Sequence, residues 1–200
     1  MTDVAGYRAS LRRILAADGD RVRTWKGDLV DEALRSSLVT VAFETPAVES
    51  SLTVVTAGRE QDISSVSALD ILSVMWPWYD SGGPAVGWRW VSEDVIWIED
   101  GEPQVGDVIR LRYRRSYSIA GLDGAVNTTV PAAWERLVLE GAAWWAYDLL
   151  LRRRSSSSAA TEAELSGIRE LSSVHRASFE SWAQRLGGAV GNPSWSDIGL

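Results

Sequence analysis

The chain has 200 residues, of which 46% are hydrophobic, and a net charge of −7 at pH 7, so it can bury a compact core. It contains no cysteine, which excludes disulfides, thiol catalysis and cysteine-ligated zinc. The acidic balance argues against a general nucleic-acid binder, because such proteins carry a basic face. No apolar run approaches the roughly 18–20 residues of a membrane span, and the acidic start after Met1 predicts no signal peptide.

Two features of the composition are uneven. The chain has 11 tryptophans against two phenylalanines, and tryptophan is common in cores and in interfaces because it is large and keeps one polar N–H. Residues 51–130 hold 11 acidic and 6 basic side chains, whereas the segments on either side are close to balanced. The acidic excess therefore belongs to the middle of the chain, where it serves solubility or a partner.

The first 47 residues predict two helices. Over residues 3–17 apolar side chains recur at helical spacing, with arginines off the stripe. The members of this stripe are Val4, Tyr7, Leu11, Ile14 and Leu15. A second helix is expected to start at Asp28, a favourable N-cap residue. It should stop at Thr45, because the residue before a proline leaves the helical region.

From about residue 50 the apolar period changes to that of strands. Short candidate strands, separated by hairpin-like turns, lie over residues 51–56, 59–66, 69–79, 87–91 and 94–98. The clearest alternation follows them, with Ile109, Leu111 and Tyr113 on one face. The opposite face carries Arg110, Arg112 and Arg114. This segment predicts a half-buried strand of an antiparallel sheet.

The C-terminal third predicts two more helices. Thr128 and Thr129 are expected to cap a helix that opens at Pro131. Its apolar stripe contains Trp134, Leu137, Val138, Gly141, Trp145 and Leu149. A serine-rich joint at 155–158 follows, and then Thr161 and Glu164 fit the capping box of a last helix. That helix is expected to end at residues 187–188, where two glycines stand together.

These elements predict an α+β fold, in which two N-terminal and two C-terminal helices form a bundle with an inserted antiparallel β-sheet or small β-sandwich. The expected parts are an N-terminal helical pair (1–47), an antiparallel β region (48–118), a C-terminal helical part that packs with the N-terminal helices (119–188) and an extended tail (189–200). The tail either frays, as tails commonly do, or docks on a partner through Trp195, Ile198 and Leu200.

The histidine and the acidic residues give no strong catalytic signature. His175 is the one histidine, and it lies on the apolar stripe of the last helix, where a packed or interface residue is more common than a base. Carboxylate pairs occur in turns, where acidic residues are expected anyway; examples are Glu99/Asp100 and Asp70/Asp80. An acid–base role for such a pair requires a geometry that the sequence does not give.

Metal and phosphate motifs are also missing from the sequence. The acidic group formed by Asp94, Glu99, Asp100 and Glu102 matches no calcium loop with its fixed ligand positions. No glycine pattern of a phosphate-binding loop occurs. We therefore expect no enzyme, cofactor or metal, and we read the unusual residues as material for assembly. The expected subunit contacts are Arg110, Arg112, Arg114, Trp88 and Trp90, with the arginine row pairing with acidic neighbours or a partner subunit rather than with DNA.

Four phrases of the sequence occur in a familiar order after the two helices. They are MWPWY at 75–79, WRW at 88–90, GEPQVGDVIRLRY at 101–113 and SYSIAGLDGAVNTTVPAAWERLVLEGAAWWAY at 116–147. In this order the chain resembles the head-to-tail connector proteins (adaptor or neck proteins) of tailed phages and prophages. The resemblance covers roughly residues 3–150 and is most specific over 101–147.

The resemblance implies a structural virion protein of the head-to-tail neck, made in the host cytoplasm. Subunits would form a homo-oligomeric ring, commonly of twelve, beneath the portal protein. The ring would extend the DNA channel and receive the next component, a stopper, tail terminator or other tail protein. Helices near the ring interior would line the channel, and an acidic lumen would let genomic DNA pass without sequence-specific binding. The portal contact would use Trp195, Ile198, Leu200, Trp182 and Phe179, and no residue would be catalytic.

Other classes of protein remain open beside this one. The chain could be another tail or baseplate component, or a small glycan- or peptide-binding module that uses Trp88 and Trp90 on one face. An enzyme would need a concave site that joins two or more acids with His175 or Tyr113. An adaptor forms or joins a ring, whereas a binding module stays a monomer or small oligomer and responds to its ligand.

Overall fold

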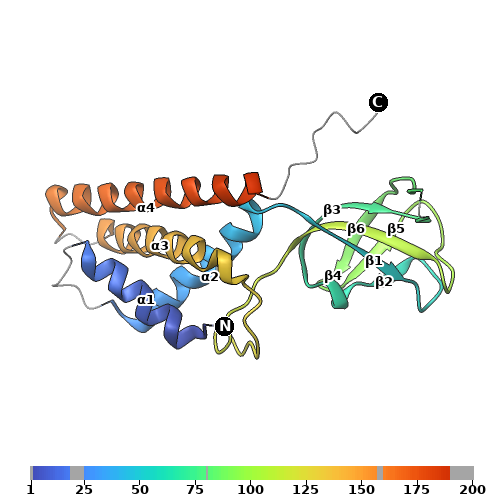
Figure 1. Cartoon of the computed structure of the whole chain (residues 1–200), viewed down its shortest axis with the longest axis horizontal. Helices are drawn as coiled ribbons and strands as arrows, with labels where there is room; N and C mark the ends of the chain where they lie inside the picture. Colours follow the sequence, from blue (N-terminus) through green and yellow to red (C-terminus); the bar gives the residue numbers. More distant parts are fainter. Residues whose placement is uncertain (1, 19–24, 80, 157–159, 190–200) are drawn as a thin grey trace. The chain divides into compact units, whose positions relative to one another are not determined.

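The computed structural model describes residues 2–18, 25–79, 81–156 and 160–189 (Figure 1). It divides into two compact units: a helical unit, which combines the chain up to Thr45 with the chain from Tyr117 onward, and a β unit, Pro46–Ser116. Two N-terminal and two C-terminal helices flank two antiparallel three-stranded sheets, so the predicted α+β class is confirmed. No helix among these described residues is long and apolar enough to cross a lipid bilayer.

The first two helices form close to where the sequence predicts them. In α1 (Val4–Ala17) the Asp3 carboxylate accepts a hydrogen bond from the Gly6 amide at 2.9 Å and so caps the helix. α2 (Gly27–Glu44) ends before Pro46, as expected. Its N-cap residue is Lys26, so the prediction of Asp28 as the N-cap is wrong. Asp28 lies in the first turn, where its charge still favours the helix N-terminus.

The segment before the third helix differs from the prediction. A 3-10 turn (Ala132–Trp134) leads into α3 (Glu135–Ser155), and no side chain caps this helix. Thr128 Oγ1 instead accepts from the Ala120 amide, and Thr129 Oγ1 accepts from the Ser118 amide, both at 2.9 Å. The two hydroxyls therefore satisfy amides of their own loop. That loop buries Ile119, Leu122 and Val130 in the core of the helical unit.

The last helix, α4 (Glu162–Ala189), begins at the predicted capping residue. Thr161 Oγ1 accepts from the Glu164 amide at 3.3 Å. The helix continues through the two glycines at 187–188, so the prediction of its end there is wrong. α3 is the central helix of the unit and packs against α1, α2 and α4 (Figure 1). Its predicted stripe supplies buried residues, among them Leu137, Val138 and Gly141.

The β unit contains six strands in two sheets. They are β1 (Val48–Thr53), β2 (Glu60–Asp62), β3 (Ala68–Met75), β4 (Trp88–Ser92), β5 (Val95–Ile98) and β6 (Val108–Arg115). The first sheet has the order β1-β6-β3 and the second β2-β5-β4, and every neighbouring pair is antiparallel. Side chains from both sheets share one core, so the unit is a small sandwich whose inner residues include Ile71, Ile96, Ile98, Ile109 and Leu111.

The residue bounds of the strands differ from the predicted ranges, although the strands follow one another along the chain as predicted. β1 starts at Val48 rather than at residue 51, and residues 59–66 yield only the short β2 followed by a 3-10 turn, Ser64–Val66. β3 ends at Met75, ahead of Pro77, which lacks the amide hydrogen that a strand ladder needs. The prediction for β6 is confirmed, because Ile109, Leu111 and Tyr113 are buried and the arginines between them are not.

Candidate functional site

The tryptophans lie at the margins of the two cores rather than inside them. None of the ten described tryptophans is fully buried, and Trp90 is the one most open to solvent, with 39% of its surface exposed. Arginine side chains cover the outer faces of five of them. The pairs, with the distance from guanidinium carbon to ring centre, are Arg110 on Trp78 (5.4 Å), Arg176 on Trp144 (5.3 Å), Arg152 on Trp145 (5.7 Å), Arg185 on Trp182 (5.5 Å), and Arg59 and Arg89 on Trp97 (5.9 and 5.4 Å).

The arginine row of β6, defined as Arg110, Arg112 and Arg114, lies on the outer face of the first sheet. Arg110 forms an ion pair with Glu49 of β1 at 3.0 Å, and Arg114 forms one with Asp70 of β3 at 3.8 Å. Arg112 lies between them and makes no ion pair within the described part of the chain. The row is thus partly neutralised by acidic residues of the flanking strands, which is one of the two outcomes the sequence allows.

Trp88 and Trp90 lie on one side of β4, but their rings do not form a flat platform. The ring centres are 5.8 Å apart and the planes meet at 82°. Trp88 packs against the core of the β unit, whereas Trp90 lines a surface hollow of about 520 Å³ together with Leu69, Ser67 and Asp94. A sugar that stacks on two coplanar rings would not find them here, because the two ring planes are nearly perpendicular.

The residues proposed for partner docking fall into two groups. Phe179 is buried in the helical unit, where its ring meets that of Trp144, so it presents almost no surface to a partner. Trp182 is partly buried against the same core. Trp195, Ile198 and Leu200 lie outside the described residues.

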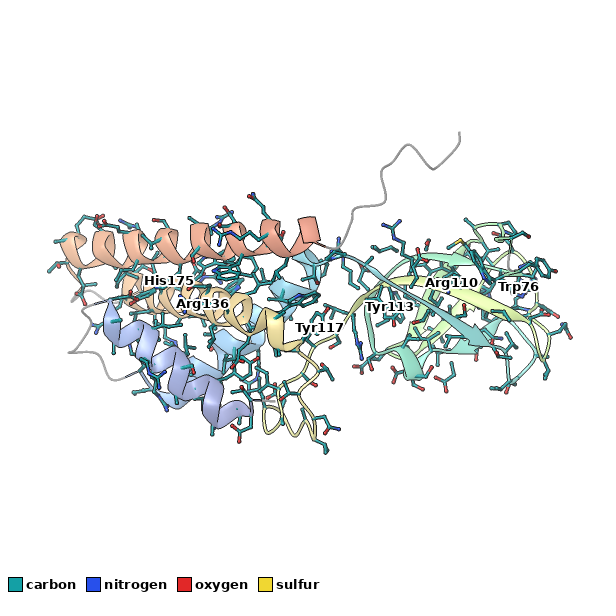
Figure 2. All side chains as sticks on the ribbon, in the orientation of Figure 1. Trp76, Arg110, Tyr113, Tyr117, Arg136 and His175 are labelled. Carbon is teal, nitrogen blue, oxygen red and sulfur yellow. The ribbon has the colours of Figure 1, made fainter. Side chains whose placement is uncertain are left out.

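An ionic cluster, defined as Asp18, Arg136, Glu140 and His175, joins the end of α1 to α3 and α4; Glu140 and His175 are its buried members. His175 Nδ1 lies 2.9 Å from Glu140 Oε2, and His175 Nε2 lies 2.9 Å from Asp18 Oδ2. Arg136 pairs with the other oxygen of Glu140. Figure 2 shows Arg136 and His175 within the helical unit. Glu140 and His175 are 2% and 6% exposed, so the two charges are nearly withdrawn from water.

The geometry of the cluster fixes the charge of His175. An ionised carboxylate only accepts hydrogen bonds, and a neutral imidazole has one N–H, so two carboxylates at the two ring nitrogens require the imidazolium form. Burial alone lowers the pKa of His175, but the hydrogen bonds to Glu140 and Asp18 and the charges of these groups outweigh it and raise the pKa above its ordinary value. The cluster then balances two positive charges against two negative ones.

The pKa of Glu140 is shifted in the opposite direction, downward. Burial alone raises the pKa of Glu140, but the hydrogen bond from His175 and the charges of Arg136 and His175 outweigh it, so the pKa lies below its ordinary value. Tyr147 completes the cluster: its ring stacks on His175 with 5.7 Å between centres, and its hydroxyl donates to Asp18 Oδ2 at 2.8 Å. Both nitrogens of His175 are thus occupied, so the arrangement suits the holding of α4 better than proton transfer.

Sequence reasoning placed His175 in a packed position but missed its partners. One signal was available, because Glu140 lies within the apolar stripe of α3, where a carboxylate needs a buried cation. Two positions suggest such a cation: Arg136, one turn earlier on the same helix, and His175, on the stripe of the next helix. Asp18 gave no signal of this kind, because it is 157 residues away from His175 and looks like an ordinary helix end.

The cluster predicts that the free energy of unfolding falls as the pH rises above the pKa that His175 has in the unfolded chain. His175 has a raised pKa in the folded chain, so above its unfolded value of about 6.5 the folded state holds one proton more than the unfolded state. The contribution is complete below that value and is lost as pH rises through the folded pKa, by up to about 1.4 kcal/mol per pH unit. Glu140 gives the opposite case, in which its contribution is lost as pH falls below its ordinary pKa.

Urea unfolding between pH 6 and pH 9 measures the alkaline effect. The free energy of unfolding should fall with pH in the natural chain and stay nearly level in a variant with His175→Leu and Glu140→Leu. Parallel curves for the two proteins would show that His175 does not carry the proton.

The acidic residues singled out in the sequence have structural partners or neighbours where the structure describes them. Asp70 pairs with Arg114, the Asp100 carboxylate accepts from the Gly87 amide at 2.6 Å, and Asp80 lies outside the described residues. Over the described ranges, no group of three or more His, Asp or Glu side chains is placed to hold a metal ion.

Comparison with known proteins adds a structural likeness but no sequence match. No family model matches the chain, and no curated protein sequence matches it. Among solved structures, a chain of the "Neck of native GTA particle computed with C12 symmetry" is similar at 15% identity, over 85% of this chain and 93% of that chain, with a TM-score of 0.27. At this identity and TM-score the likeness carries no argument about function, which has to rest on the sequence and the contacts above.

Proposed function

We propose that the chain is a structural protein of a tailed-phage or prophage neck. It is a head-to-tail adaptor that forms a ring, of twelve subunits, beneath the portal protein, extends the DNA channel and receives a stopper or other tail component. One observation carries the proposal: the sequence stretches that resemble adaptor proteins include the central strand of the first sheet in the β unit and the start of the central helix in the helical unit. Residues 101–113 include most of β6, the central strand of the first sheet, and 116–147 lead into α3, the central helix.

Two further observations favour a structural role over catalysis. The ionic cluster uses both nitrogens of His175 to hold helices together, which leaves that side chain no free nitrogen for a substrate. The β unit carries an acidic excess, with 11 acidic and 6 basic residues over Pro46–Ser116. An acidic surface offers DNA phosphates no counter-charge, so a ring built from chains with such a unit would not hold the DNA that passes through it.

Electron microscopy of the purified chain mixed with the portal protein of the same phage or prophage tests the proposal. We expect discrete rings added to one end of the portal. A chain that stays monomeric both alone and with portal would contradict the proposal and would return attention to a ligand-binding module at Trp90, to be tested by a glycan screen.

The same experiment tests the tail as the portal anchor. The predicted tail, residues 189–200, begins with Ala189, which is the last residue of α4. It carries three large apolar side chains in a Gly- and Pro-containing segment: Trp195, Ile198 and Leu200. A chain that ends at residue 189 should keep the circular dichroism spectrum of the full chain and fail to attach to portal. Normal attachment of the shortened chain would assign the anchor to another surface.

A further inference from the structure

We propose that two different surfaces of the β unit bind each other between neighbouring copies of the chain. The first is the acidic corner, defined as Trp90, Val91, Glu93 and Asp94 at the turn from β4 to β5. The second is the arginine row of β6. This inference rests on the ring assembly of the proposed function and names the contacts that would build the ring.

The acidic corner combines exposed apolar surface with unpaired charge. Trp90 and Val91 are 39% and 48% exposed. Glu93 and Asp94 are exposed, and their carboxylates have no hydrogen-bond or ion-pair partner among the residues that the structure describes. All but Val91 border the hollow of about 520 Å³. A tryptophan face beside two carboxylates is a suitable site for a guanidinium, which pairs with the acids and stacks on the ring.

The arginine row offers the complementary chemistry. Arg110 and Arg114 are held by Glu49 and Asp70, but Arg112 stands between them in the middle of the sheet face without an ion pair among the described residues. Trp78 lies under Arg110 and widens the face with an aromatic ring. Arginine and tryptophan are enriched at the energetically important centres of protein interfaces.

The two surfaces cannot meet within one copy. The arginine row points away from the core of the sandwich, on the outer face of the first sheet, as its alternation with buried Ile109 and Leu111 shows. The second sheet, which carries the acidic corner, packs on the inner face of the first. Contact between two different patches on identical chains is heterologous, so it repeats in one direction and makes a ring when the rotation closes.

Charge reversal with mixing tests this pairing. Arg112→Glu makes both surfaces negative, and Glu93→Arg with Asp94→Arg makes both positive. Each variant alone should lose ring formation on portal, because like charges then face each other in every contact. An equal mixture should regain rings, because alternating copies restore an opposite-charge pair at every contact. Regained rings also show that both variants are folded.

The outcomes separate this inference from the proposed function. Rings formed by Arg112→Glu alone, or no rings from the mixture, would overturn the pairing while leaving the adaptor proposal in place. Failure of the natural chain to form rings with portal would overturn both. Arg13→Glu, on the exposed side of α1, is the matched control and should form rings as the natural chain does.

Discussion

Replacement of His175 by alanine should lower the free energy of unfolding by about 3–5 kcal/mol, the usual result of removing one partner from a buried ion pair. The variant leaves the Glu140 and Asp18 carboxylates without the cation between them. Glu140 is 2% exposed, so water cannot replace the lost contacts. Arg136 still pairs with Glu140 Oε1, but Glu140 Oε2 loses the donor that His175 supplied. Urea unfolding at pH 7, followed by circular dichroism, measures the loss.

Two further variants identify the cause of this loss. His175→Leu combined with Glu140→Leu replaces the buried charges by apolar side chains and should recover most of the stability, because a buried ion pair is often no better than well-packed apolar residues. Val174→Ala, at an exposed position of the same helix, should change stability by no more than about 0.5 kcal/mol. A double variant as unstable as His175→Ala would mean that shape, and not unpaired charge, decides the cost.

The sequence predicts the elements of this fold better than its contacts. The period of the apolar residues located α1, α3 and the two faces of β6, because burial of one face repeats along the element and leaves a local pattern. The loop before α3 was misread because hydroxyls such as that of Thr128 can satisfy either a helix end or a loop amide. The choice depends on Ala120, which the chain brings close only when folded.

The ionic cluster and the acidic corner show the same limit at the level of sites. The partners of His175 lie 35 and 157 residues away, so their meeting depends on how three helices pack. The sequence also does not predict that Arg112 lacks an ion pair among the described residues. Arg110 and Arg112 occupy equivalent positions in the strand pattern, and only the folded sheet shows that Glu49 pairs with Arg110. The residue types of a site can therefore be predicted here, but which of them are paired cannot.

Gly141 lies where α3 packs closely against α2 and α4, and its replacement by alanine should destabilise the chain by about 1–3 kcal/mol, the usual cost of overpacking a core. A Cβ atom there would lie 2.5 Å from Ser37 Oγ and 3.1 Å from the Phe179 ring. Ser37 cannot simply turn away, because its hydroxyl donates to the Val138 carbonyl at 2.7 Å. The loss should appear although alanine is the better helix former by about 1 kcal/mol.

Gly167→Ala on α4 is the matched control, because nothing lies within 4 Å of a Cβ atom at that position. There the helix preference acts alone, so the variant should gain about 0.5–1 kcal/mol. Opposite signs for the two Gly→Ala variants in urea unfolding would establish that close helix packing, and not backbone freedom, requires glycine at 141. Equal gains would mean that the helices can separate there at little cost. The Glu140–His175 contact, which bridges α3 and α4 from the residue next to Gly141, would then have to tolerate that separation.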